Sequence, residues 1–293
     1  MNVVLTGATG FIGSHILTEL HEHGHDVTGL VRTDADASTI AAAGATPAVV
    51  DLYDRPGLSS LLSSSDGAIH TASPGDATSG NLDSAVVDAA IDAFANTGKP
   101  YLHISGDWIY GNNRDISERS PIEAPAMVAY KPPIESRVLD ADGMRGVVIV
   151  SSVAYGDGGG GVPGIVLGSP RDADGNLIML GTGQQHWSTV HVEDIADFFR
   201  RALEDESARG RYVIGDGSNS TVAEVTEAAA VAAGAPGAVP GSDDEAKARL
   251  GDYFAEVLLL DQGTNAAKAR AELDWNPSHP GLADEFRDGS YRK

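Results

Sequence analysis

Residues 2–13 of this 293-residue chain read NVVLTGATGFIG. The apolar run Val3–Leu5 predicts a buried strand, and apolar residues then recur at helical spacing over residues 11–20. The glycines between them, Gly7, Gly10 and Gly13, let the backbone turn tightly and approach a pyrophosphate without a Cβ in the way. The N-terminus of the following helix offers free N–H groups and a partial positive charge to such an anion. This stretch therefore predicts the start of a dinucleotide-binding domain.

Short apolar strands alternate with helical stretches along the first half of the chain. This alternation is typical of an α/β protein with a doubly wound parallel sheet. We expect a helix with an apolar stripe over Asn81–Asn96, and a dinucleotide-binding domain over residues 1–151. The further strands are expected at Asp26–Arg32, Thr46–Val50, Gly67–Thr71, Pro100–Ser105 and Arg145–Ser151.

The pattern loosens after residue 151. Two glycine-rich stretches, Gly156–Gly161 and Gly164–Gly175, read as loops. A hairpin-like stretch around Ile178–Val190 leads into a helix at Val192–Glu204. We therefore expect residues 152–293 to form a small C-terminal substrate-binding lobe, with some elements returning to the sheet.

Composition limits the classes of function. The chain has no cysteine, which excludes disulfides, thiolate metal sites and cysteine nucleophiles. Its net charge of −22 argues against nucleic-acid or anionic-membrane partners, because phosphate binding needs basic surfaces. The acidic residues are spread along the chain, which fits a highly soluble surface, with adaptation to high salt as the alternative interpretation. With neither a membrane-spanning stretch nor a leader in sight, we expect a cytoplasmic protein that acts on a small molecule.

Several short motifs resemble, in order and spacing, those of the short-chain dehydrogenase/reductase superfamily, in its extended or atypical epimerase/dehydratase-like branch. The resemblance implies a Rossmann sheet, a nicotinamide cofactor and oxidoreductase activity; relatives often form homodimers through the helix after Asn81 and the one that carries Glu135. The motifs span nearly the whole chain: the glycine turn at residues 7–13, Asp51-Leu52, His70-Thr71-Ala72, Ser105–Gly111, Val153–Gly156, His191–Ala196 and Leu273–Pro277.

The end of the second predicted strand bears on the choice of cofactor. NAD-binding proteins usually place an acidic residue there to hold the ribose 2′-hydroxyl, whereas this strand ends with Arg32. A guanidinium favours a 2′-phosphate, so NADP is expected over NAD, with Asp34 or Asp36 as ribose ligands in the alternative. The resemblance assigns cofactor contacts to Thr6, Gly7, Thr9, Gly10, Phe11, Ile12, Gly13, Arg32, Asp51, Leu52, Thr71, Ala72 and Lys131.

The catalytic positions depart from the family pattern. The family uses a Ser or Thr after the fifth strand and a Tyr-x-x-x-Lys pair, in which the lysine lowers the pKa of the tyrosine. In this chain the hydroxyl position falls on Gly106 and the tyrosine position on Met127, and only Lys131 is retained. Because a thioether cannot transfer a proton, two of the three groups are missing.

Other residues are candidates for proton transfer. They are Lys131 itself, Tyr130, Asp107 and Ser105, although a one-residue shift on a strand turns Ser105 to the opposite face. Pro132 and Pro133 suggest that the helix starts there, which would leave Tyr130 free to swing toward the nicotinamide. Trp108, Tyr155, His186 and Trp187 are candidate substrate-pocket residues, each with packing as the alternative role. His191 and Asp194 are interpreted as structural, and no spacing suggests a metal site.

Two classes of function remain. The first is an NADP-dependent oxidoreductase that reduces a carbonyl or related unsaturated group of a small organic molecule, with a nucleotide-sugar epimerase or dehydratase as a variant. The variant is weakened because few basic residues, Arg171 being the clearest, are present to hold a sugar diphosphate. The second class is a non-catalytic NADP-binding sensor or interaction protein, which the missing tyrosine and hydroxyl favour.

Overall fold

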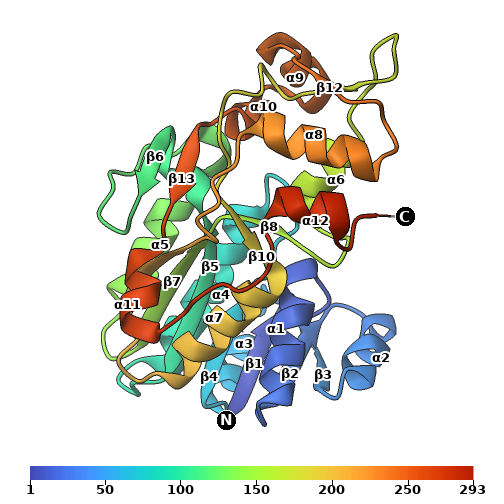
Figure 1. Ribbon diagram of the computed structural model, residues 1–293. Helices are drawn as coiled ribbons and strands as arrows, with labels where there is room; N and C mark the ends of the chain where they lie inside the picture. The colour runs from blue at the N-terminus through green and yellow to red at the C-terminus, as the bar shows by residue number, and fades with distance from the viewer. Residues whose placement is uncertain (293) are drawn as a thin grey trace.

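A parallel sheet of seven strands forms the centre of the molecule (Figure 1). The computed structural model describes residues 1–292. The strand order is β11-β7-β5-β4-β1-β2-β3, so the chain starts near the middle and winds to both sides. The doubly wound α/β fold is therefore confirmed. The strands are β1 (Asn2–Thr6), β2 (Asp26–Val31), β3 (Thr46–Val49), β4 (Gly67–His70), β5 (Pro100–Gly106), β7 (Arg145–Ser151) and β11 (Gly210–Ile214).

Helices cover both faces of this sheet. On one face, α1 (Phe11–Glu22) packs against α7 (Val192–Glu204), and their apolar stripes bury Leu17 and Phe198 in one core cluster. The other face carries α3 (Arg55–Ser63), α4 (Ser79–Phe94) and α5 (Lys131–Leu139), which enclose a second cluster with β4 and β5. Two shorter helices complete this layer arrangement, α2 (Asp34–Ala42) beside β3 and α11 (Ala267–Leu273) beside β11.

The second half of the chain builds a smaller lobe above the sheet (Figure 1). Its core is a third apolar cluster, in which Trp187, Val225 and Phe286 are buried. The lobe contains helices α6 (Gly161–Leu167), α8 (Val222–Ala232), α9 (Asp243–Leu250), α10 (Asp252–Leu258) and α12 (Leu282–Asp288). Short parallel strand pairs complete it: β8 (Val153–Tyr155) with β10 (Thr189–His191), β9 (Leu177–Ile178) with β12 (Ala238–Val239), and β6 (Asn113–Ile116) with β13 (Gln262–Thr264).

Most expected elements agree with the structure to within two residues, but two expectations are wrong. The stretch Ile178–Val190 is not a hairpin, because β9 and β10 pair with β12 and β8 and not with each other. The glycine-rich stretch after Gly160 is not all loop, since α6 occupies Gly161–Leu167. There Val162 and Val166 are buried in the lobe, and that packing outweighs the low helix propensity of glycine.

The second half of the chain also contributes elements to the central sheet and its helix layer. The strand β11 comes from the second half and pairs with β7, while α7 covers α1. Returning elements of this kind were expected for residues 152–293. Within residues 1–292, no helix combines the length and the apolar character that crossing a bilayer requires.

Candidate active site

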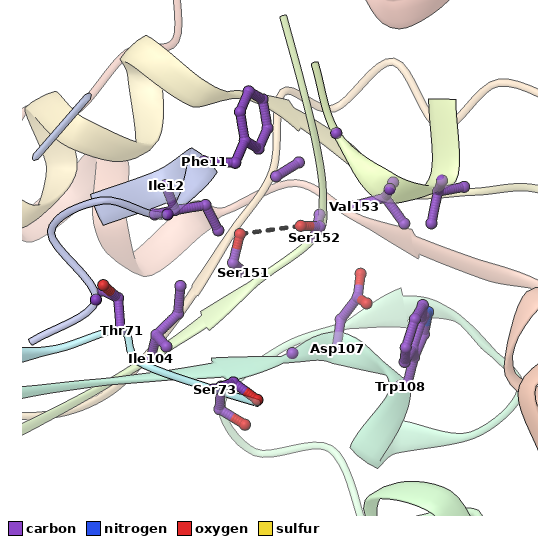
Figure 2. Close-up of a pocket in the computed structure, with 18 of the residues that line it drawn as sticks. Phe11, Ile12, Thr71, Ser73, Ile104, Asp107, Trp108, Ser151, Ser152 and Val153 are labelled. Atoms are coloured by element: carbon purple, nitrogen blue, oxygen red, sulfur yellow. Dashed lines mark hydrogen bonds between the residues drawn. The ribbon is translucent and has the colours of Figure 1, made fainter. Parts of the chain in front are cut away.

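A cleft of about 490 Å³ opens where the carboxyl ends of β1, β5 and β7 meet the lobe (Figure 2). One side, which we name the glycine-turn half, consists of Gly7, Gly10, Phe11, Ile12, Gly13 and Thr71. The opposite side, the aromatic half, consists of Asp107, Trp108, Val153, Val162 and Phe254. In doubly wound folds, ligands bind in the crevice at the carboxyl ends of the strands.

The glycine turn has the backbone shape that a dinucleotide requires. Gly7 has a φ of +74°, and its carbonyl accepts the N–H of Gly10 at 2.9 Å. A Cβ on Gly13 would lie 2.1 Å from the carbonyl oxygen of Gly7, so no side chain fits where α1 meets β1. The turn thus brings the N-terminus of α1 to the cleft with no Cβ in front of it, and these residues fit a bound pyrophosphate.

The other predicted cofactor residues lie around this turn. Arg32 follows β2 with an exposed side chain that makes no ion pair within the described residues. Asp51 is also exposed, at the end of β3, and Leu52 is partly buried beside it. The hydroxyl of Thr6 accepts the N–H groups of Thr71 and Ala72, both at 3.3 Å, so it orients the segment after β4.

Asp107 is the ionisable group of the aromatic half. It is the first residue of the short helix η1 (Asp107–Tyr110), directly after β5, and it is 2% exposed. Its carboxyl lies in the cleft next to Trp108 and across from Ser152 (Figure 2), and Oδ2 has no hydrogen-bond partner among the described residues. Burial raises the pKa of Asp107 to about 7. A carboxyl group with this pKa can both donate and accept a proton near neutral pH.

Ser105 and Gly106 end β5 at the floor of the cleft. The hydroxyl of Ser105 donates to Oε1 of the fully buried Glu135 at 2.5 Å, and Glu135 also pairs with Arg211 at 2.6 Å. The hydroxyl proton of Ser105 is therefore directed away from the cleft, as its strand position predicts. At Gly106, a Cβ would meet only the carbonyl oxygen of Ser151, at 3.8 Å.

The structure does not bring Lys131 and Tyr130 into the lining of the cleft. Lys131 is the first residue of α5, one residue before the expected start, and its Nζ lies 3.6 Å from Oδ2 of the buried Asp83. The ring of Tyr130 packs against Gly80, with the ammonium of Lys131 5.3 Å from its centroid. Met127 belongs to the short helix η2 (Ala126–Val128) and is 36% exposed.

Asp83 connects Lys131 to the glycine-turn half. His70 places Nε2 3.2 Å from Asp83 Oδ1 and Nδ1 2.7 Å from the hydroxyl of Thr6. Because that hydroxyl already accepts two backbone N–H groups, its own proton points to Nδ1, which assigns the proton of His70 to Nε2. Burial alone would raise the pKa of Asp83, but the hydrogen bond from His70 and the charge of Lys131 hold it below its usual value.

Of the four predicted pocket residues, only Trp108 lines the cleft. Tyr155 is fully buried and donates its hydroxyl proton toward Asp216 and the carbonyl of Pro280. Trp187 is buried and donates to the carbonyl of Leu258. His186 contacts Asp261 through Nδ1 at 2.9 Å. Tyr155 and Trp187 are therefore buried in the packing of the lobe, whereas His186 is partly exposed and pairs with Asp261.

Several lining residues were missed. Ser151 ends a strand that was expected and Ser152 follows it, and their position at its carboxyl end was the available signal. Phe254 lies on α10, far along the chain, and no motif marks it. Only the fold shows that it faces Trp108, with ring centroids 6.1 Å apart in an edge-to-face arrangement.

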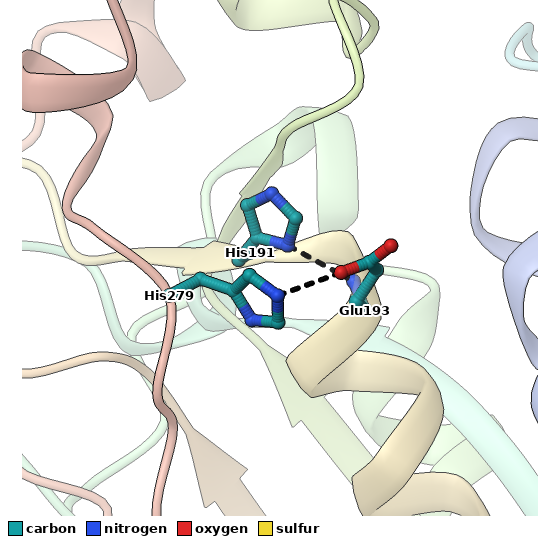
Figure 3. Close-up of side chains that lie close together, drawn as sticks. All are labelled: His191, Glu193 and His279. Carbon is teal, nitrogen blue, oxygen red and sulfur yellow. Dashed lines mark hydrogen bonds and ion pairs between the residues drawn. The ribbon is translucent and has the colours of Figure 1, made fainter. Parts of the chain in front are cut away.

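His191, Glu193 and His279 form a cluster that the sequence spacing did not suggest (Figure 3). One ligand atom from each lies within 4.8 Å of the others, a spacing compatible with a metal ion. However, Nδ1 of His191 already accepts the N–H of Glu193, and the two imidazole rings stack with centroids 4.0 Å apart at 10°. An ion cannot lie in the planes of two parallel rings at once. We assign the cluster to structure: His191 caps α7, and His279 bridges Glu193 and Asp194.

Together, the parallel sheet, the glycine turn and the cleft define a dinucleotide-binding α/β protein. Residues 3–215 match the model of the NAD dependent epimerase/dehydratase family. The chain belongs to this family, whose fold is that of an oxidoreductase, and the resemblance seen in its motifs is confirmed.

Two relatives are similar over their whole length. An uncharacterised protein of Schizosaccharomyces pombe, C2A9.02, is 27% identical over 99% of this chain and 100% of its own. A 3-diazoavenalumate denitrifying reductase from a Streptomyces species is 25% identical over all of both chains.

Solved structures agree on the fold. The human epimerase family protein SDR39U1, crystallised with NADPH, has a TM-score of 0.77 and 22% identity over 99% of both chains. The UDP-glucose 4-epimerase of Thermus thermophilus, in complex with NAD, has a TM-score of 0.75 and 23% identity over 98% of this chain and 99% of its own.

Proposed function

We propose that this protein is an NADP-dependent oxidoreductase that reduces a carbonyl or related unsaturated group of a small organic molecule, with Asp107 as the proton donor. The observation that carries the proposal is the buried Asp107 carboxyl in the cleft, whose Oδ2 lacks a partner and whose pKa is about 7. Asp107 supplies the proton that Gly106 and Met127, the residues at the family's usual hydroxyl and tyrosine positions, cannot donate.

The residues of the cleft have different roles in the proposed reaction. When bound, a reduced nicotinamide supplies a hydride. Asp107 donates its proton to the substrate oxygen as the neighbouring carbon takes up the hydride, which yields an alcohol and leaves Asp107 as a carboxylate. Solvent then returns a proton to Asp107. Gly7 and Gly13 would hold the pyrophosphate, and the exposed guanidinium of Arg32 would pair with the 2′-phosphate.

Lys131 and Tyr130 have secondary roles in this proposal. The ammonium of Lys131 is held by Asp83, and Asp83 is linked through His70 to the hydroxyl of Thr6. The ring of Tyr130 supports α4 at Gly80. Neither group needs to reach the substrate.

The test has two stages. NADPH and NADH are first titrated into the protein, with nicotinamide fluorescence as the readout, and NADPH is expected to bind more tightly. NADPH oxidation is then followed with a panel of aldehydes and ketones, using the wild type, Asp107→Asn and Tyr130→Phe. Loss of turnover in Asp107→Asn alone supports the proposal. Loss in Tyr130→Phe alone assigns the proton to the phenol, and NADPH binding without turnover of any carbonyl favours the sensor class.

A further inference from the structure

The aromatic half of the cleft has a chemical character of its own. Trp108 and Phe254 meet edge to face, 6.1 Å between centroids, and Val153 and Val162 face the same space. These four side chains come from η1, α10, β8 and α6, so the lobe and the sheet build the wall jointly. Aromatic and aliphatic walls of this kind bind flat, apolar groups, and edge-to-face packing adds to the burial of area.

Charge is sparse in the cleft. Among the lining residues within the described chain there is no Lys, Arg or His, and Asp107 is the ionisable side chain. A second diphosphate, bound in the aromatic half and away from the N-terminus of α1, would lack a cation to pair with. Any anion there would also meet the Asp107 carboxylate whenever that group is ionised.

Two arginines of the lobe, Arg171 and Arg249, do not supply this cation. Arg171, the clearest of the few basic residues that could hold a sugar diphosphate, donates to the carbonyls of Gly175 and Ala233 at 3.2 and 2.8 Å. Arg249 donates to the carbonyl of Ile165 and to the hydroxyl of Ser169. Both guanidiniums are engaged in holding loops and helix ends of the lobe.

We infer that the substrate is an uncharged aryl or aryl-conjugated carbonyl compound, with its ring against the wall that Trp108 and Phe254 form together and its oxygen at Asp107. This inference rests on the proposed function and narrows it to a substrate class. The full cleft measures about 490 Å³ and the nicotinamide takes part of it, which leaves space for a molecule of one or two rings. The reaction is the one given above: the carbonyl carbon takes the hydride of NADPH, and its oxygen takes the proton of Asp107.

The test compares three probes of defined chemistry by titration calorimetry. Benzylideneacetone is an uncharged aryl enone, cinnamate has nearly the same shape with a carboxylate in place of the ketone, and UDP-glucose represents nucleotide sugars. Each is titrated at pH 8 with and without NADP⁺, a cofactor form that binds without turnover. We expect benzylideneacetone to bind at least tenfold more tightly than cinnamate, and UDP-glucose not to bind.

Two neighbouring residues of α10 give matched variants. Phe254→Ala removes one ring of the aromatic wall. It should lower the affinity for benzylideneacetone at least tenfold and leave the affinity for NADP⁺ unchanged. Tyr253→Ala alters the adjacent ring, which is 66% exposed, and should have no effect. Phe254→Leu retains apolar volume, so it separates the loss of the ring from a folding defect.

The outcomes are distinguishable. The inference is overturned if cinnamate or UDP-glucose binds more tightly than benzylideneacetone. It is also overturned if a folded Phe254→Ala protein binds benzylideneacetone as tightly as the wild type does. An enone that binds but is not reduced with NADPH overturns the proposed function and leaves the aryl site in place. If NADP⁺ does not bind, the titrations without cofactor still decide between the three probes.

Discussion

The glycine-turn half of the cleft takes its shape from backbone packed at glycines, whereas the aromatic half takes its shape from side chains. In the first half, the carbonyl of Gly7 and the start of α1 leave no room for a Cβ at Gly13. In the second half, a Cβ at Gly106 would find open space, and the wall is assembled from four separate elements. Backbone packing fixes the shape of the nucleotide site, while the chemistry opposite it can change by single substitutions without disturbing the sheet.

The largest expected effect on cofactor binding is at Gly13. In Gly13→Ala, the new Cβ would lie 2.1 Å from the carbonyl oxygen of Gly7, so β1 and α1 must move apart. We expect NADPH affinity to fall at least about a hundredfold, roughly 2.7 kcal/mol, as measured by fluorescence titration. Gly164→Ala in α6 is the control, because nothing lies within 4 Å of its Cβ position. Equal NADPH binding by a folded Gly13→Ala protein would falsify the close-packing argument.

Asp107→Asn addresses the aromatic half. We expect a fall of about 10²- to 10⁴-fold in the rate of carbonyl reduction, with NADPH affinity unchanged. The acid is active when protonated, so wild-type reduction should decline as pH rises through about 7. The residual activity of Asp107→Asn should not decline over the same pH range. A wild-type profile that is flat between pH 6 and 8 would remove Asp107 from the reaction.

The same variant gives a stability signal that needs no substrate. The folded pKa of Asp107 is raised from 3.8 to about 7 by burial, so ionising it costs folding free energy as pH rises between these values. The melting temperature of Asp107→Asn should therefore exceed that of the wild type at pH 8, and the difference should shrink toward pH 4. The exposed Asp115→Asn is the control. A difference between wild type and Asp107→Asn that is independent of pH contradicts the raised pKa.

Arg32 should have an intermediate effect, limited to one cofactor. Its exposed guanidinium can bind the 2′-phosphate of NADP, and NAD lacks this phosphate. Arg32→Ala should lower the affinity for NADPH about ten- to a hundredfold and leave the affinity for NADH unchanged. The exposed Arg119→Ala should change neither. Equal weakening of both cofactors would mean that Arg32 acts on the fold and not on the phosphate.

The smallest effect is expected at Gly106. Its φ of −136° suits any residue, and a Cβ there makes only an ordinary contact with Ser151. Gly106→Ser should change the free energy of unfolding by less than about 0.5 kcal/mol and raise the reduction rate a few-fold by adding a hydroxyl at the family's usual position. Thermal melts and NADPH oxidation measure the two effects. A strongly destabilised variant would show that this half is as tightly packed as the glycine turn.

The same contrast explains which parts of the molecule could be predicted from sequence. The glycine turn and the strands of the sheet depend on local patterns, so β7 was placed correctly at Arg145–Ser151 and α7 at Val192–Glu204. The pairing of β9 with β12 depends on chain segments about 60 residues apart. No local pattern encodes that partner, and the expected hairpin was wrong for this reason.

The site follows the same rule. Asp107 and Trp108 could be found because they directly follow β5, at the edge where ligands bind. Phe254 could not, because its place in the cleft results from the fold of the lobe. Lys131 was recognised from its spacing, but the spacing carries no information about Asp83, the buried carboxylate beside it.

The return of β11 to the sheet affects how the chain folds during its synthesis. When Ser151 has left the ribosome, β7 has a neighbour on one side only, and the apolar stripe of α1 still lacks its cover from α7. About 60 further residues must be made before Gly210–Ile214 can close that edge, which takes about 3–12 s at ordinary rates of translation. During this interval an open strand edge and an uncovered helix face are present together, a combination that attracts chaperones and promotes aggregation.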